Sequence, residues 1–227
     1  MKSLIDHARA FAAHHVADPR HADTFRALEA GQSPQALFIT CSDSRVVPAL
    51  ITGARPGELF ELRTAGNVVP PYPRTAGDRP LGEAATIEYA VRVLGVRDIV
   101  VCGHSHCGAI GALVRGEDLS TVPAVRGWLE HSVPSGAPVR SLEAGAPDVA
   151  EAVQAHVVAQ LAALRGYPCV DERRARGSLA LHGWYYEVHT GAVTAYRPRA
   201  DGARAAHEPA ADAGPAVDAG RPAFGPL

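Results

Sequence analysis

Several features that assign a partner or a compartment to a protein are missing from this sequence. Its 24 acidic and 22 basic residues nearly cancel, so it lacks the excess positive charge typical of nucleic-acid binding. It also lacks any run of roughly 20 apolar residues, the length that a membrane-spanning helix needs. Histidine and aspartate interrupt the N-terminal segment MKSLIDHARAFAAHH, where a secretion signal has a continuous apolar core. We therefore expect a cytoplasmic protein that binds a small molecule, and neither nucleic acid nor a membrane.

Cysteine is scarce as well, and its spacing argues against a disulfide framework. The 227 residues contain 4 cysteines, at positions 41, 102, 107 and 169. In a reducing compartment, a cysteine close to histidine and aspartate more often binds a metal or takes part in catalysis. Cys41 and Cys107 have such neighbours. Strand alternation points Cys102 away from them and predicts a small buried side chain, and we expect Cys169 to be structural or free.

The apolar pattern predicts an α/β fold with a mainly parallel sheet. Short apolar runs bounded by turn residues predict strands at 36–40, 58–64 and 98–104. Helical spacing of apolar residues predicts helices at 81–95 and 148–166. Strand, helix and strand in succession are typical of a parallel sheet with flanking helices. Two later apolar runs flank His189-Thr190-Gly191, which predicts a C-terminal hairpin that adds an antiparallel strand to the sheet.

Composition divides the chain into three regions. Residues 1–34 form an N-terminal helical arm, with a predicted break at Asp18-Pro19. Residues 35–198 form the α/β catalytic domain, which carries the candidate site. Residues 199–227 are rich in alanine, glycine and proline and have almost no large apolar side chains, so we expect a disordered tail.

Two polar clusters follow predicted strands directly, where parallel sheets place their sites. CSDSR contains Cys41, and GHSHCG contains His104 and Cys107. Because His104 and Cys107 stand three apart where a strand gives way to a helix, both can project to one side of the helix's first turn. Zinc prefers thiolate and imidazole ligands, and three protein ligands leave the open position that marks a catalytic site.

Rival interpretations of these clusters use other chemistry. Cys41 with His104 is also a possible pair of thiol nucleophile and base. Gly103 to Cys107 resembles the G-x-S-x-G turn of serine hydrolases, except that Cys107 replaces the final glycine. A phosphate loop fits less well, because the lysine and hydroxyl residue that should follow are missing. Neither nucleophile scheme uses both cysteines, and the residues alone leave these alternatives open.

Four motifs in the same order resemble the β-class carbonic anhydrases over residues 3–198. They are CSDSR, RTAGNVVPP, GHSHCG and HGWYYEV. The resemblance implies one Zn²⁺ per chain, with Cys41, His104 and Cys107 as its ligands. It implies reversible hydration of carbon dioxide to bicarbonate and a proton, through attack of zinc-bound hydroxide. It also implies a homodimer or an assembly of dimers, in which the arm packs on a second subunit, although its apolar face suits its own sheet equally well.

By the same resemblance, Asp43 and Arg45 are the paired residues beside the metal. Paired with Arg45, Asp43 stays ionised, accepts a hydrogen bond from the zinc-bound hydroxide and orients it toward carbon dioxide. With the pair broken, Asp43 becomes the fourth zinc ligand and closes the site. Gln32 matches the plant-like branch of the family, and Phe38 stands where the other branch has tryptophan. We therefore predict the open state at neutral pH.

The resemblance also assigns a small pocket for carbon dioxide. Its residues are Gln32, Phe60, Ala65, Tyr89 and Gly108, with Ala65 replacing a larger aliphatic side chain. An apolar lining suits a substrate that offers little for hydrogen bonds to hold. Without the resemblance, Phe60 and Tyr89 would be assigned to the core and Gln32 to an ordinary loop. His106 stands between the ligands in sequence, and we expect its side chain to face solvent.

Two other functions remain open. One is hydrolysis of a carbon dioxide analogue, carbonyl sulfide or carbon disulfide, at the same zinc site. The other is a non-catalytic protein that binds zinc or senses bicarbonate. A sensor has no need of an activating pair, so the presence of both Asp43 and Arg45 argues for an enzyme, a zinc-dependent carbonic anhydrase.

Overall fold

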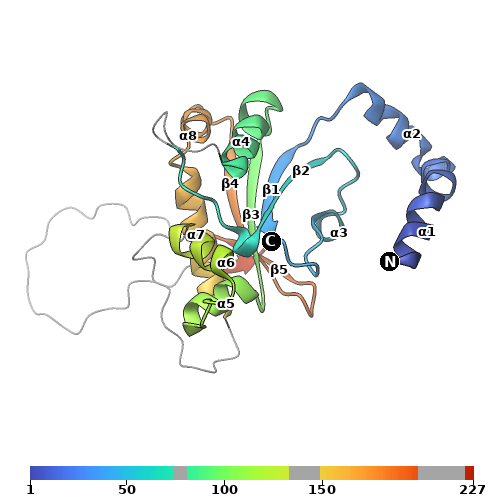
Figure 1. Cartoon of the computed structure of the whole chain (residues 1–227). Helices are drawn as coiled ribbons and strands as arrows, with labels where there is room; N and C mark the ends of the chain where they lie inside the picture. The colour runs from blue at the N-terminus through green and yellow to red at the C-terminus, as the bar shows by residue number, and fades with distance from the viewer. Residues whose placement is uncertain (74–80, 133–148, 199–222) are drawn as a thin grey trace, which may run out of the picture.

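The centre of the molecule is a sheet with the strand order β2-β1-β3-β4-β5-β6 (Figure 1). The computed structural model describes residues 1–73, 81–132, 149–198 and 223–227. The strands are β1 (Ala36–Cys41), β2 (Leu59–Thr64), β3 (Asp98–His104), β4 (Ala180–Tyr186), β5 (Val193–Tyr196) and β6 (Phe224–Pro226). β1 to β4 run parallel, whereas β5 and β6 are each antiparallel to the preceding strand. The predicted α/β fold, with a mainly parallel sheet and an antiparallel C-terminal hairpin, is confirmed.

Helices connect and flank these strands. They are α1 (Lys2–Phe11), η1 (Ala12–Val16), α2 (Pro19–Ala27), η2 (Leu28–Ala30), α3 (Pro48–Thr52), η3 (Ala65–Asn67), α4 (Gly82–Glu88), η4 (Tyr89–Val93), α5 (Gly108–Arg115), α6 (Pro123–Ser132), α7 (Ala150–Leu164) and α8 (Pro168–Ala175). The predicted helices 81–95 and 148–166 correspond to α4 with η4 and to α7. Sequence spacing does not predict α3, α6 and α8, which have 5, 10 and 8 residues. No helix in the described ranges is long and apolar enough to cross a membrane.

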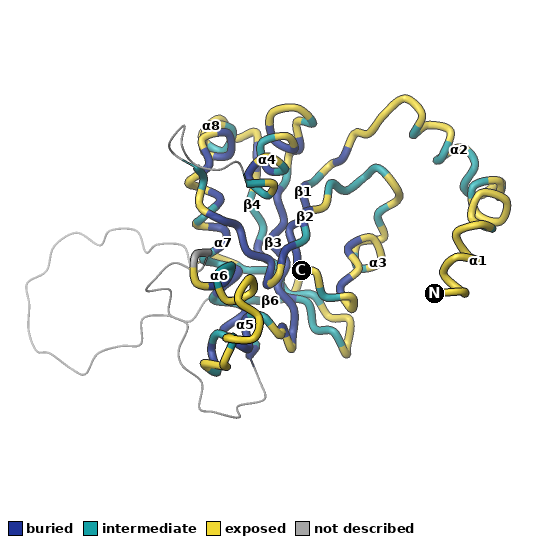
Figure 2. Tube along the Cα trace, viewed as in Figure 1, coloured by how far each residue is buried: buried dark blue, intermediate teal, exposed yellow. Residues whose placement is uncertain are grey.

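Alternation along the strands divides the core into two layers. Leu37 of β1 and Ile99 of β3 are fully buried in one layer, with apolar side chains of α4, α7 and α8. Phe38 and Cys102 are fully buried in the other layer, where Trp184 packs against them. The central strands β1 and β3 are accordingly almost wholly buried in the trace of Figure 2. Cys102 is thus the small buried side chain that strand alternation predicts.

The N-terminal arm projects away from the sheet (Figure 1). The predicted break is confirmed, because Asp18 caps α2 by accepting a hydrogen bond from the Arg20 backbone at 2.9 Å, and Pro19 occupies the first helical position. No residue of α1 is buried, and the side chains of Leu4 and Ile5 are 68% and 44% exposed. The alternative in which α1 covers its own sheet is therefore wrong.

The prediction of a disordered tail is wrong at its C-terminal end. Phe224–Pro226 form β6, in which Phe224 pairs with Tyr196 of β5. The two aromatic rings lie 5.7 Å apart, and Arg197 Nη2 donates to the Pro226 carbonyl at 2.7 Å. Composition misleads here because an edge strand pairs through its backbone and needs only one large side chain to pack. The remaining tail, 199–222, lies outside the described residues.

Candidate metal centre

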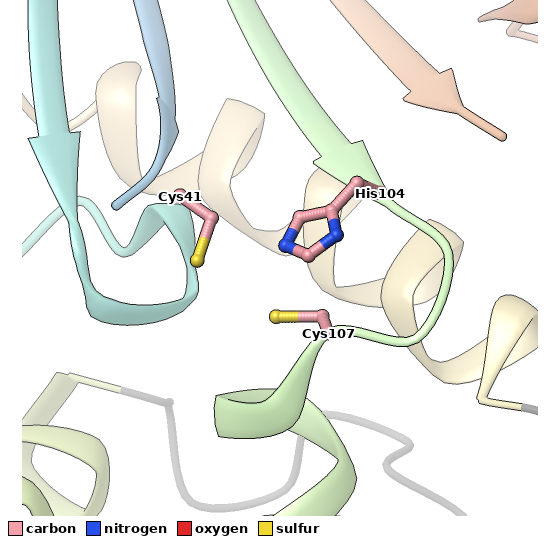
Figure 3. A group of neighbouring side chains, drawn as sticks. All are labelled: Cys41, His104 and Cys107. Carbon is pink, nitrogen blue, oxygen red and sulfur yellow. The ribbon is translucent and has the colours of Figure 1, made fainter. Parts of the chain in front are cut away.

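Three side chains converge at the carboxyl ends of β1 and β3 (Figure 3). Cys41 ends β1, His104 ends β3, and Cys107 is the N-cap of α5. All three are buried, and their ligand atoms lie within 4.8 Å of one another. Both sulfur atoms and the imidazole ring point into the same space. The parallel sheet therefore brings together the three residues that the sequence selects as a ligand set.

His104 and Cys107 face the same space because of a tight turn between β3 and α5, and not because both lie on the first turn of a helix. β3 continues through His104, which pairs with Tyr186, and α5 begins only after Cys107. Between them, His106 has a φ of 55°, a left-handed conformation that residues other than glycine rarely adopt. The expected helical projection of this pair is wrong for that reason. The side chain of His106 is exposed, as expected.

His104 presents one nitrogen lone pair to the cluster. Its Nδ1 lies 2.9 Å from the Ser105 carbonyl, and because a carbonyl only accepts hydrogen bonds, Nδ1 carries the proton. Nε2 then has a free lone pair, and it is buried without a hydrogen-bond partner. Buried polar atoms are normally paired, so an unpaired Nε2 beside two sulfur atoms fits a metal ligand.

The thiols of Cys41 and Cys107 are joined by a hydrogen bond that affects their protonation. A hydrogen bond from Cys107 holds the pKa of the Cys41 thiol well below its usual range, although burial opposes it. Metal binding requires deprotonated cysteine, so one ligand is already favoured in that form. Two sulfur ligands with one imidazole form a donor set that zinc prefers. The residues therefore fit a zinc ion.

Asp43 and Arg45 form an ion pair beside the cluster. Arg45 Nε donates to Asp43 Oδ1 at 2.9 Å, and Nη2 donates to Oδ2 at 2.7 Å. The Arg45 backbone N–H also donates to Oδ1 at 2.9 Å. The Arg45 hydrogen bonds hold the pKa of Asp43 well below its usual range, so this carboxyl group is ionised. Asp43 Oδ2 lies 3.9 Å from His104 Nε2, so the carboxylate borders the space that the ligands face.

Arg63 contributes to the site in a way that motif analysis misses. From β2, its Nη2 donates to the backbone carbonyls of Cys41, Asp43 and Val46 at 2.9, 2.9 and 2.8 Å. These bonds fix the loop that carries Asp43 and Arg45. In the sequence, Arg63 is marked only as the first residue of the run RTAGNVVPP. Its contacts with the Asp43 loop depend on the pairing of β2 with β1, which the motif does not reveal.

Helix α7 fixes the segment that follows β2. His156 Nε2 donates to the Gly66 carbonyl at 2.8 Å, and Gln160 Oε1 accepts from the Val69 backbone N–H at 2.7 Å. Both side chains are buried. Burial lowers the pKa of His156 to about 4, so its ring is neutral near neutral pH and keeps the Nε2 proton for this bond. Two buried side chains of one helix thus anchor the carboxyl edge of the sheet.

Two of the predicted pocket residues lie near the ligands. Ala65 follows β2 directly, and Gly108 is the first residue of α5 after Cys107. The two segments touch, because a Cβ on Gly66 would lie 3.2 Å from Ala109 Cβ. A Cβ on Gly108 would meet no atom within 4 Å, so the space beside it is open.

The other three predicted pocket residues lie at the opposite end of the sheet. Gln32 is exposed in the loop before β1. Phe60 is the second residue of β2, four residues before the level of Cys41, which is about 13 Å along a strand. Tyr89 packs beside Phe60, with ring centroids 5.9 Å apart. Within one chain, these side chains do not reach the cluster.

The fold and the cluster together define an α/β protein with a candidate Cys-His-Cys metal centre at the carboxyl edge of a parallel sheet. The family model described as carbonic anhydrase matches residues 36–193. A carbonic anhydrase of Pseudomonas aeruginosa is 49% identical over 180 residues, which cover 78% of this chain and 80% of that protein. The chain therefore belongs to the β-carbonic anhydrase family, an enzyme family whose general reaction is the hydration of carbon dioxide.

Solved structures agree with this assignment. The structure of the β-carbonic anhydrase CcaA has a TM-score of 0.73 at 38% identity, covering 87% of this chain and 95% of that chain. One of two tetrameric β-carbonic anhydrases from the ascomycete Sordaria macrospora has a TM-score of 0.63 at 28% identity, covering 86% and 95%. The sequence resemblance to the β class is confirmed.

Proposed function

We propose that Cys41, His104 and Cys107 hold one zinc ion per chain, and that the enzyme reversibly hydrates carbon dioxide to bicarbonate and a proton. The observation that carries this proposal is the buried, unpaired Nε2 of His104, which faces two sulfur atoms and has the ionised Asp43 at 3.9 Å. When bound, zinc lowers the pKa of water from 15.7 to about 7 and so makes hydroxide available at neutral pH.

Asp43 positions the attacking oxygen. Arg45 holds both oxygens of the carboxylate, with two hydrogen bonds to Oδ1 and one to Oδ2, so Oδ2 keeps a lone pair for a further hydrogen bond. Asp43 accepts such a bond from the attacking oxygen and thereby directs that oxygen's remaining lone pair toward carbon dioxide. These hydrogen bonds from Arg45 also support the open state, because they restrain the carboxylate of Asp43 from turning to become the fourth zinc ligand.

A second copy of the chain completes the substrate pocket in this proposal. Ala65 and Gly108 line it from the chain that carries the ligands, next to open space. Gln32, Phe60 and Tyr89 lie too far along the sheet to serve their own cluster, so they serve the cluster of the second copy. Tyr89 is 45% exposed, which leaves its ring available for that contact.

The same assembly accounts for the arm. α1 carries exposed apolar side chains and covers no part of its own sheet, so a second subunit is its natural partner. We propose a homodimer or an assembly of dimers, which agrees with the tetramers of the Sordaria relatives. We place the enzyme in the plant-like branch because of Gln32 and Phe38, and in the cytoplasm because its cysteines are all free.

Stopped-flow measurement of carbon dioxide hydration tests the proposal. The metal-replete protein is expected to be active between about pH 7 and 9. Cys107→Ser is expected to lose both bound zinc and activity, whereas the control Cys169→Ser, a buried cysteine of α8 outside the cluster, keeps both. Inactive but fully metallated protein would contradict the proposal, as would a Cys107→Ser variant with normal zinc content. Parallel assays with carbonyl sulfide and carbon disulfide separate hydration from hydrolysis of an analogue.

A further inference from the structure

A second group of metal-binding side chains lies on the outer side of the ligand turn. It consists of His106, Glu187 and His189, whose ligand atoms all lie within 4.8 Å of one another. Glu187 Oε1 and His189 Nδ1 are 3.1 Å apart. His106 comes from the turn between β3 and α5, and the other two come from the turn between β4 and β5. None of the three belongs to the Cys41, His104 and Cys107 cluster.

Backbone hydrogen bonds fix the two turns against each other. The Ser105 backbone N–H donates to the Tyr186 carbonyl at 2.9 Å, and the Val188 backbone N–H donates to Ser105 Oγ at 2.9 Å. Ser105 is buried, so these bonds are shielded from water. Each bond joins a residue next to His106 with a residue next to Glu187. The side chains that face one another here are therefore held by a scaffold rather than by flexible loops.

The backbone of His106 is a second indication of a defined position. Its φ of 55° is unfavourable for a side chain with a Cβ, and glycine would adopt it at lower cost. In this conformation a ring nitrogen of His106 lies within 4.8 Å of the ligand atoms of Glu187 and His189. The carbonyl of the same residue accepts a hydrogen bond from Arg45 Nη2 at 3.2 Å, which restrains the turn from its other side.

We propose that His106, Glu187 and His189 bind a second divalent transition-metal ion, distinct from the ion of the buried centre. Two imidazoles with one carboxylate form a donor set that suits zinc and its neighbours in the first transition series, and does not suit calcium or magnesium, which prefer oxygen alone. Glu187 supplies negative charge, and the nearby charge of Arg45 is offset by its pairing with Asp43. The solvent-facing position leaves room for water to complete the coordination.

Zinc titration of the full-length protein tests this site. Protein that already holds its first zinc equivalent is titrated calorimetrically with further Zn²⁺ at about pH 7.5, since protonation of the ligands weakens binding. A second equivalent is expected to bind to the wild type. His106→Gly and His189→Ala are each expected to weaken it by at least about 10-fold, and Glu187→Gln by a similar factor. Glycine is chosen at position 106 because it suits the local φ, so the turn persists without the ring.

The control is His14→Ala, which removes an exposed histidine of the arm and is expected to leave the second binding event unchanged. Absence of a second equivalent in the wild type would overturn the proposal. Equal affinity in the wild type, His106→Gly and His189→Ala would overturn it as well, because the ion would then bind elsewhere. Retention of the first zinc equivalent in His106→Gly separates this result from damage to the buried centre.

Discussion

At the scale of single residues, the centre depends on keeping specific groups charged and others neutral. Asp43 is charged because three hydrogen bonds from Arg45 stabilise its carboxylate, two from the guanidinium and one from the backbone. His104 is held in one tautomer by the Ser105 carbonyl. The charge of Asp43 and the tautomer of His104 are both set by hydrogen bonds to residues close in sequence, so single substitutions test them directly.

Asp43→Asn is expected to lower kcat/KM for carbon dioxide hydration by about 100-fold or more. The amide keeps the shape of the side chain but loses the charge that pairs with Arg45 and can present a donor to the attacking oxygen. The zinc content is expected to stay normal, since Asp43 is not a ligand in the open state. The control is Asp118→Asn, whose carboxylate bonds only to Ser120 in the described structure. Equal activity of the wild type and Asp43→Asn would remove Asp43 from the mechanism.

His156 is a buried group that must stay neutral, and this makes stability depend on pH. Its pKa falls from 6.5 in the unfolded chain to about 4 in the folded protein, chiefly because of burial. Between these values the unfolded state binds more protons than the folded state, so the free energy of unfolding falls as the pH is lowered. The stabilisation is complete above about pH 6.5 and is lost as the pH falls through about 4, for a total of about 3 kcal/mol.

His156→Gln is expected to remove this contribution. Urea unfolding of the wild type and the variant at several pH values measures it as the difference between the two free energies. That difference should shrink steadily from about pH 7 to about pH 4. A constant difference for His156→Gln across the window would contradict the assignment.

At the scale of elements, the close approach of α7 to the sheet positions the ligands. Gly103 precedes His104 in β3, and a Cβ there would lie 2.5 Å from Val153 Cγ1 and 2.7 Å from Val157 Cγ2. Gly183 in β4 faces α7 almost as closely, with Leu161 and Val157 at 3.0 Å from such a Cβ. The same helix holds the segment after β2 through His156 and Gln160. Any displacement of α7 therefore moves two edges of the metal centre.

Gly103→Ala is expected to lower the free energy of unfolding by about 1 to 3 kcal/mol through overpacking. It should also weaken zinc binding, because the helix and His104 have to shift apart. Denaturant unfolding and metal analysis measure the two effects. The matched control is Gly127→Ala in α6, where a Cβ meets no atom within 4 Å and alanine raises the stability by about 0.5 to 1 kcal/mol. Unchanged stability in Gly103→Ala would show that α7 does not constrain the strand.

At the scale of the whole molecule, two features of the chain bear on the proposed assembly. The apolar side chains of α1 are exposed, and the aromatic pair of Phe60 and Tyr89 lies at the end of the sheet opposite to Cys41. One assembly resolves both features, if the second copy covers the arm and receives the aromatic pair. Assembly and activity are then coupled.

The double substitution Leu4→Glu and Ile5→Glu is expected to reduce the mass of the particle in light scattering after size-exclusion chromatography. Two charges on the apolar face of α1 oppose its burial against a second subunit. The hydration rate per chain is expected to fall with the mass. Val122→Glu, an exposed apolar position after α5, serves as the control and should change neither. A double variant that keeps the wild-type mass would contradict the role of the arm.

Local sequence patterns were enough to predict the features that depend on short stretches of the chain. Apolar runs predicted the first strands, and the order of those strands put Cys41 and His104 at one edge of a parallel sheet. Residue types and the family resemblance predicted Cys41, His104 and Cys107 as a ligand set, and the fold brings these three residues together. The pairing of Phe224 with Tyr196 was missed, because composition describes a segment and not the edge that it can join.

Contacts that depend on strand register and helix packing could not be predicted from local patterns. Arg63 reaches three carbonyls of another strand's loop, and His156 reaches Gly66 from 90 positions away, so neither role is visible in a motif. The grouping of His106 with Glu187 and His189 depends likewise on two turns meeting beside β3 and β4. Such contacts join residues far apart along the chain, and their geometry exists only once the sheet has formed.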